Sequence, residues 1–302
     1  MTKSAAATLE ERVGQIETTP SIPTIFLPLL NLLNLPPERV KLDEVVKLVS
    51  YDNTIAAQCL RVASSPLFGL AKSPDSIRAA VISLGLRRVE TILLTCCLGN
   101  AFPTENWPLD PTTFWKHSLG CAMVCRKFSE KLATGDSDKA YMAGLLHDIG
   151  FMVNCIAFPK EFAAAAAHAA QEQIPFDQAE RATMGFTHCE TGRALAQKWH
   201  LSDDLVQVIA YHHSPKESQG HRPLAALVHL SDLLCRMRGM GYGYYERQKV
   251  DLMSDPAWAI LLAEHKSLAD MDMALFSFQM DEAVEEVSEL VATIFGAAKA
   301  KN

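Results

Sequence analysis

Apolar residues recur three or four positions apart along most of the chain, which is the spacing of one face of an α-helix. The pattern is clear in segments 41–65, 73–102 and 109–133, and it continues through 159–213 and 222–238. No segment shows the sustained alternation of apolar and polar residues that is typical of a β-strand. The sequence therefore predicts an all-α protein of about a dozen helices.

Helix-start signals divide this pattern into separate elements. Asp110 followed by Pro111 is typical of an N-cap and a first helical residue. Ser137 is the expected cap of the helix that leads into "YMAGLLHDIGFMV", and Ser254 with Pro256 predicts a later helix start. The run "FPTENWPLDPTT" (102–113) is rich in proline, threonine and acidic residues. We therefore expect a boundary between two parts of the fold there.

One apolar stretch, residues 141–153, holds a histidine and an aspartate side by side, His147 and Asp148. A buried carboxylate beside an imidazole is unfavourable unless another group compensates its charge. Further polar residues interrupt other apolar helices in the same way. They are His117, His188, His212, His213 and Asp232.

Imidazole and carboxylate groups are the ligands that suit divalent transition metals. A bound ion would offset the buried charge of Asp148, and the two oxygens of this carboxylate would let it bridge two ions. The competing interpretation is that these are separate core histidines, each satisfied by local hydrogen bonds. For the whole set we favour the metal site, because buried charged groups are rare unless they are paired or bound to metal.

The formal net charge of −7 argues against a broad nucleic-acid surface, so we do not expect nucleic acid as a partner. Segment 79–94 has a helix–glycine–helix pattern with Arg87 and Arg88, which also fits a DNA-binding motif. Apolar runs on both of its helices favour an ordinary helical hairpin.

The eight cysteines form no C-x-x-C pair and lie among apolar neighbours, which indicates reduced thiols. Cys121 and Cys125, four residues apart, are interpreted as core packing. The N-terminal residues lack a basic start followed by an apolar core, and no window reaches the roughly 18 apolar residues of a membrane span. We therefore expect a cytoplasmic protein with no membrane association.

The order H, HD, H, HH, D resembles that of the HD superfamily of metal-dependent phosphohydrolases, and the flanking sequence resembles its HDOD branch. The segments "FWKHSLGCA", "AYMAGLLHDIGFMV", "GFTHCETGRALAQKWHLSDDLVQVIAYHHSP" and "ALVHLSDLL" follow the order of that family. The resemblance covers residues 20–236, approximately. It implies an N-terminal helical subdomain (20–110) after a short segment (1–19), an HD-type bundle (111–240) and a C-terminal extension of covering helices (241–302).

The resemblance also implies a ligand set. The residues that match the basic HD metal site are His117, His147, Asp148 and Asp232. In the related HD-GYP phosphodiesterases, residues matching His188, His212 and His213 extend the site to a second ion. We therefore expect one or two divalent ions, iron or manganese first, with nickel or zinc as alternatives.

Three positions depart from the HD-GYP pattern. Phe151 replaces a lysine that can contact substrate phosphate, Thr113 stands where some dinuclear relatives have an acidic residue, and no Gly-Tyr-Pro loop follows His213. Lys116 is the one basic residue that we find in the motifs themselves. These departures argue against hydrolysis of cyclic dinucleotides.

Two functions remain open from the sequence. The first is a signalling or regulatory module with a metal site and a protein partner, as in bacterial signalling. The second is a phosphohydrolase for a nucleotide or another phosphoester, with Asp148 bridging the ions and a histidine such as His213 protonating the leaving oxygen if it is not itself a ligand. Enzyme status is left undecided.

Two more residues have alternative interpretations. His229 lies three residues before Asp232, so it is either a partner that orients a ligand or a satisfied core histidine. Glu190 is either such a partner or a solvated carboxylate at a helix start, and we favour the latter.

Overall fold

The computed structural model describes residues 24–33, 35–101, 107–242 and 251–295. Within these residues the chain forms α-helices and short 3-10 helices and contains no strand. The prediction of an all-α protein is therefore confirmed.

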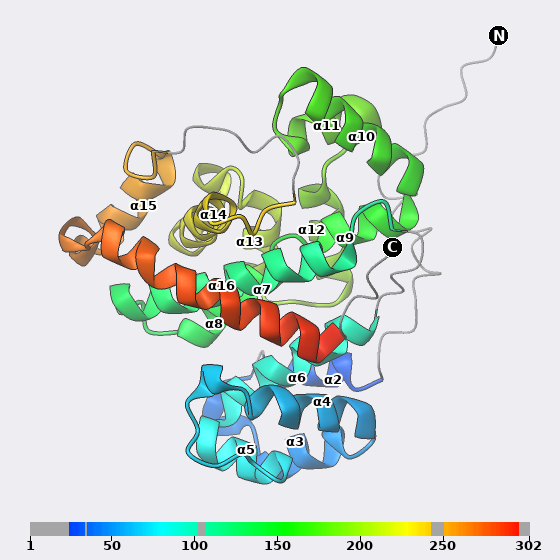
Figure 1. Cartoon of the computed structure of the whole chain (residues 1–302), viewed down its shortest axis with the longest axis vertical. Coiled ribbons are helices and arrows are strands. Elements are labelled where there is room, and N and C mark those ends of the chain that lie inside the picture. The colour runs from blue at the N-terminus through cyan, green and yellow to red at the C-terminus, as the bar shows by residue number, and fades with distance from the viewer. Residues whose placement is uncertain (1–23, 34, 102–106, 243–250, 296–302) are drawn as a thin grey trace.

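The first helices form a compact group at one end of the molecule, drawn in blue and cyan in Figure 1. Helix α6 packs against α2, α4 and α5, and α3 covers α5. The members of this group are α2 (Phe26–Leu33), α3 (Leu42–Val49), α4 (Asn53–Ala63), α5 (Ile77–Leu84) and α6 (Leu86–Ala101).

The central bundle is built around α7, which packs along α8 and α14. Helix α12 crosses α9, and α13 lies against α12, α14 and α8. The bundle helices are α7 (Pro111–Leu132), α8 (Ser137–Leu146), α9 (Ile149–Ala157), α12 (His188–Lys198), α13 (Asp203–Tyr211) and α14 (Arg222–Met237). Helices α10 (Pro159–Glu172) and α11 (Phe176–Met184) form a hairpin that projects beside the bundle (Figure 1).

Two C-terminal helices cover the bundle. Helix α15 (Pro256–Glu264) packs on α14, and the long α16 (Met273–Phe295) lies across α7 and reaches α4 and α6 (Figure 1). At this junction Gln58 Nε2 donates to the Ile294 carbonyl at 3.2 Å, and Asn100 Nδ2 donates to Gln58 Oε1 at 2.6 Å. One continuous apolar core joins the two groups of helices, so the domain boundaries proposed above stay predictions.

The helix caps follow local geometry more closely than the sequence suggested. Asp110 caps α7 as predicted, because its carboxylate accepts from Thr112 N at 3.0 Å. The predictions of Ser137 and Ser254 were each wrong by one residue. Asp136 caps α8 and Asp255 caps α15, since each carboxylate precedes the first helical residue and reaches an otherwise unpaired N–H of the first turn.

The hairpin of α5 and α6 turns at Gly85, whose φ of 87° is favourable for glycine alone. Its arginines pair with other residues of the chain. Arg87 Nη1 donates to Glu90 at 3.1 Å, and Arg88 lies 3.8 Å from Glu130. The two arginines therefore serve contacts within the chain, as in an ordinary helical hairpin.

Residues Ser137–Ala157, which comprise α8 and α9, contain an 18-residue window with a mean hydropathy of 1.3 and pass the length test for a membrane span among the described residues. However, 89% of that window is buried inside the protein. A buried core helix has the same composition, so its apolar residues are explained by the core.

Candidate metal centre

The helices of the bundle bring all seven predicted ligands to one place. His117 and Asp232 lie within α7 and α14, and His188 is the first residue of α12. The paired residues fall at helix ends. His147 and Asp148 join α8 to α9, and His212 follows α13. In a regular helix, adjacent side chains point about 100° apart. The break in the helix at each pair lets both side chains face the same interior.

A first group of donor atoms surrounds His117. Its Nε2 lies 3.3 Å from His147 Nε2, 3.2 Å from Asp232 Oδ1 and 3.5 Å from Asp148 Oδ2. His147 Nε2 lies 3.1 Å from the same Asp148 oxygen. All four residues are at most 1% exposed.

A second group surrounds the other oxygen of Asp148. Oδ1 lies 3.2 Å from His212 Nε2 and 3.4 Å from His188 Nε2, and His213 Nε2 lies 3.1 Å from His188 Nε2. His188 and His212 are buried, whereas His213 is partly exposed. Asp148 therefore lies between the two groups with one oxygen facing each of them.

The Nδ1 atoms, on the side of each ring away from the centre, fix the tautomers of three buried histidines. In each ring Nδ1 lies at hydrogen-bond distance from a backbone carbonyl, which can only accept. Each neutral ring thus carries its proton on Nδ1 and directs the lone pair of Nε2 into the centre. The pairs are His117 with Met240, His147 with Gly144, and His212 with Ile209, at 2.8, 2.7 and 3.1 Å.

Lone pairs and carboxylates that converge in this way repel one another unless a cation lies between them. Asp148 Oδ1 and Asp232 Oδ2 also receive no hydrogen bond from the described residues, although both are buried. Buried carboxylate oxygens are normally paired. The donor set therefore fits one or two divalent ions.

The electrostatics of the cluster keep both carboxylates ionised. Burial raises the pKa of Asp148, but His147 and the other imidazoles outweigh burial and hold it well below its ordinary value. Burial also raises the pKa of Asp232, and Arg236 and His117 reverse that effect. Conversely, burial lowers the pKa of His212, while the neighbouring Cys189 and Asp148 raise it to about 10. The site thus attracts positive charge.

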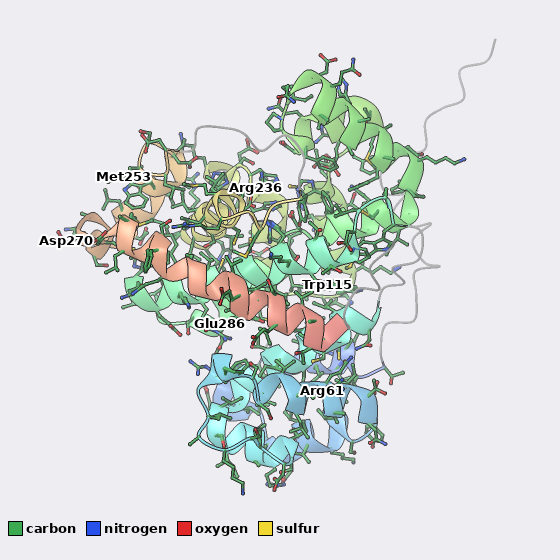
Figure 2. The ribbon with its side chains drawn as sticks, viewed as in Figure 1. Arg61, Trp115, Arg236, Met253, Asp270 and Glu286 are labelled. Atoms are coloured by element: carbon green, nitrogen blue, oxygen red, sulfur yellow. The ribbon has the colours of Figure 1, made fainter. Side chains whose placement is uncertain are left out.

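Three residues that the sequence did not single out hold the cluster in place. Glu180 of α11 accepts from His188 Nδ1 at 2.6 Å and from the His188 backbone N–H at 2.9 Å. Arg236 Nε donates to Asp232 Oδ1 at 2.7 Å, and Tyr242 donates its hydroxyl proton to Asp148 Oδ2 at 2.7 Å. In Figure 2, Arg236 marks α14, and Trp115 marks the start of α7 two residues before His117.

Only one of these three had a sequence signal. Arg236 follows Asp232 by four residues, a spacing that places the two side chains on one face of α14. Our interpretation of Lys116 as the one basic residue in the motifs overlooked it. Glu180 and Tyr242 come from segments with no motif, and only the packing of α11 and of the chain after α14 brings them here.

Phe151, the position that departs from the HD-GYP lysine, lies in a group of aromatic rings beside the centre. Its ring stacks on Tyr242 with centroids 4.3 Å apart and planes 16° apart. Phe162 meets it edge-on at 4.7 Å, and Tyr242 lies 4.5 Å from His117. Aromatic side chains therefore fill the space where the lysine of the HD-GYP pattern would begin.

The two residues with open interpretations are also placed. His229 Nδ1 lies 2.7 Å from the His212 carbonyl and its Nε2 lies 3.3 Å from Asp255, so His229 supports the chain at a predicted ligand. Glu190 forms a capping box with Thr187 at the start of α12 and pairs with Arg181 at 2.7 Å. The helix-start interpretation of Glu190 is therefore correct.

The comparisons with known proteins agree with this architecture. The HDOD domain family matches residues 19–215. A solved HDOD domain protein of unknown function from Geobacter sulfurreducens is 31% identical, with a TM-score of 0.80 over 94% of this chain and 97% of that one.

Two more distant proteins are also similar. A structure from Shewanella amazonensis SB2B, provisionally named a phosphohydrolase, is 21% identical with a TM-score of 0.71, covering 94% of this chain and 98% of that one. An uncharacterised protein of Treponema pallidum (strain Nichols) is 26% identical over 239 residues, which are 78% of this chain. The chain spans 45% of the length of that relative.

Proposed function

The chain belongs to the HDOD domain family, and from that premise we propose that it is a signalling or regulatory module whose bundle holds a divalent metal centre. His117, His147 and Asp232 would hold one ion, and His188, His212 and His213 a second. Asp148 would bridge the two. We further propose that the module acts in the cytoplasm through a protein partner.

The enclosure of the centre is the observation that carries this proposal. Six of the seven predicted ligands are at most 3% exposed. The Tyr242 hydroxyl donates a hydrogen bond to Asp148 Oδ2, and the Tyr242 ring stacks on Phe151. A phosphoester that approached the first group would have to displace this tyrosine. A closed centre suits an ion that links helices better than one that turns over substrate.

Two ions bridged by Asp148 would together connect α7, the α8–α9 junction, α12, the end of α13 and α14, because each contributes at least one donor atom. The binding free energy of a site formed only in the folded state adds to folding stability. The family and the donor set support a divalent metal. Iron or manganese stays our first expectation for its identity, with nickel or zinc as alternatives.

A phosphohydrolase is the alternative function, and the open side of the second group favours it. His213 is partly exposed, and Arg236 acts electrostatically on both His213 and Asp232. There Arg236 would bind a phosphate oxygen, and His213, if it were not itself a metal ligand, would protonate the leaving oxygen. A divalent ion would supply Lewis-acid polarisation and activation of water. Phe151 disfavours cyclic dinucleotides as substrates.

The deciding experiment is elemental analysis of the full chain as purified, beside an Asp148→Ala variant. We expect one to two equivalents of a transition metal, lost in the variant. The metal-loaded protein is then assayed against a panel of phosphomonoesters and phosphodiesters. The module predicts no turnover in any metal form. Turnover that disappears in Asp148→Ala would establish the hydrolase instead, and a well-folded protein without metal would refute the centre itself.

A further inference from the structure

One cysteine lies among the donor atoms of the first group. Cys121 follows His117 by four residues on α7, so both side chains lie on the same helix face. Its Sγ lies 3.6 Å from His117 Nε2, and the side chain is fully buried. The donor atoms of His117, Cys121, His147 and Asp232 all lie within 4.8 Å of one another.

The distances match the edges of a coordination tetrahedron. With metal–nitrogen and metal–oxygen bonds of about 2.0 Å and a metal–sulfur bond of about 2.3 Å, the edges are about 3.3 Å for N–N and N–O and about 3.5 Å for N–S. The corresponding distances from His117 Nε2 are 3.3 Å to His147, 3.2 Å to Asp232 and 3.6 Å to Cys121. All three edges agree with one central ion.

We propose that Cys121 is a sulfur ligand of the ion in the first group, together with His117, His147 and Asp232. The proposal deepens the metal centre proposed above and rests on it. Asp148 Oδ2, 3.1 Å from His147 Nε2, adds a fifth donor, a coordination number that zinc reaches when its tetrahedral site expands. On binding, the thiol of Cys121 gives its proton to solvent and coordinates as the thiolate.

A second cysteine near the centre differs in geometry. Cys189 Sγ lies 3.9 Å from His212 Nδ1 and 4.0 Å from His212 Nε2, so it is equally far from both ring nitrogens. A ligand of an ion on Nε2 would lie nearer to Nε2, because Nδ1 is turned to the Ile209 carbonyl. Cys189 is therefore a matched control for Cys121: buried, beside a predicted ligand, but not directed at an ion.

The sulfur changes the expected metal. Thiolate is a soft ligand that favours zinc or iron over manganese, which prefers oxygen. With Cys121 as a ligand, we expect iron or zinc in the first group, and no longer iron or manganese. In the second group the Cys189 sulfur also lies within 4.8 Å of donor atoms of His188, His212 and His213, but its 4.0 Å distance from His212 Nε2 is longer than the N–S edge of a tetrahedron.

The test is a cobalt(II) titration of the metal-free full chain, followed by absorption spectroscopy. We expect visible ligand-field bands together with an intense near-ultraviolet band from sulfur-to-cobalt charge transfer. Cys121→Ser should lose the charge-transfer band and keep the visible bands, while Cys189→Ser should keep both. Circular dichroism checks that each variant is folded, and Cys121→Ala provides a second variant without a donor atom.

The possible results separate the two proposals. Visible bands without charge transfer in the unchanged protein, or charge transfer that survives in Cys121→Ser, would overturn the sulfur ligand and leave the metal centre standing. Failure of cobalt to bind the folded protein at all would overturn the centre, and the sulfur ligand with it.

Discussion

Individual side chains in the centre are set by the groups behind them. The carbonyl facing each Nδ1 leaves the Nε2 lone pair of His117, His147 and His212 directed inward. For His188 the group behind the ring is a carboxylate, that of Glu180, which is itself 0% exposed. A carboxylate in this position orients the ring and makes its other nitrogen a stronger donor to a metal.

Glu180→Gln should therefore weaken metal binding in the second group. The amide would accept less strongly from His188 Nδ1, and loss of such a partner typically costs between about 10-fold and 100-fold in affinity. Competition with a chromogenic chelator measures the change. Glu190→Gln, a change at a partly exposed carboxylate that pairs with Arg181, serves as the control. Equal affinities in both variants would contradict the role of Glu180.

A second residue-scale prediction concerns the Asp204–Lys139 ion pair, with Oδ2 and Nζ 2.7 Å apart. Burial raises the pKa of Asp204. Hydrogen bonds from Lys139, Ser202 and the Leu205 N–H lower it by more than burial raises it, so the pKa lies below the ordinary value of 3.8. Since the folded pKa is below the unfolded one, the carboxylate stabilises the fold above the unfolded pKa. That contribution is lost as the pH falls through the folded pKa.

Asp204→Asn should thus reduce the free energy of unfolding near neutral pH, because the ion pair is lost. The reduction should be no more than about 1 kcal/mol, because solvent around the exposed Lys139 screens the pair. The difference from the unchanged protein should shrink once the pH falls below about 4. Urea unfolding at several pH values measures it. Asp203→Asn, at a side chain 74% exposed, is the neighbouring control. A difference that stays constant with pH would show that the charge is not responsible.

At the scale of elements, the crossing of α9 and α12 determines how the two groups of ligands meet. A Cβ atom at Gly150 would lie 1.9 Å from the His188 carbonyl oxygen and 2.4 Å from Gly192 N. Backbone atoms cannot yield as a flexible side chain can. Two glycines therefore let α9, which begins after Asp148, approach α12, which begins at His188. The glycine of "HDIG" is a packing requirement of the centre.

Gly150→Ala should separate these helices and destabilise the protein by about 3 kcal/mol, the upper range for overpacking in a core. The metal content should fall with it, because Asp148 and His188 move apart. Gly120→Ala is the matched control, since its Cβ would meet the end of the Met240 side chain, Sδ at 2.8 Å, which can shift. Denaturant unfolding and elemental analysis measure both effects. A tolerated Gly150→Ala would refute the close crossing.

At the scale of the whole molecule, the proposed centre draws on helices from across the bundle, while α16 ties that bundle to the N-terminal helices. The apolar core runs without interruption from Ile25 to Ile294. A change in stability at the centre should therefore reach the entire fold. This coupling would let a metal site with no substrate still act as a regulatory element.

Removal of metal by a chelator should accordingly lower the melting temperature of the full chain by several degrees. An ion present at 100 times its dissociation constant contributes about 2.7 kcal/mol to stability. Asp148→Ala, which lacks the carboxylate between the groups, should melt at the same temperature with and without metal. Differential scanning calorimetry makes the comparison. Identical melting of the loaded and stripped unchanged protein would argue against any structural role of the ion.

Much of this protein was predictable from local patterns. Helical periodicity and caps depend on residues within about four positions of one another, so the all-α class and the start of α7 at Asp110 could be derived directly. The residue types in "LLHDIG" and "IAYHHSP" likewise indicated which side chains to expect together. The cap errors at Ser137 and Ser254 are one residue each, because neighbouring acidic side chains compete for the same N–H groups.

The sequence by itself thus determined the helical class, the order of the polar residues in the apolar helices, and the likeness to the HDOD family. Three contacts depend instead on how distant helices pack: Glu180 accepts from His188, Tyr242 donates to Asp148 Oδ2, and the Cys121 sulfur lies within 4.8 Å of donor atoms of His147 and Asp232. The difference lies in the sequence separation of the residues that interact. Helical periodicity depends on residues within a single helix, whereas a centre shared by several helices depends on how helices far apart in the sequence pack.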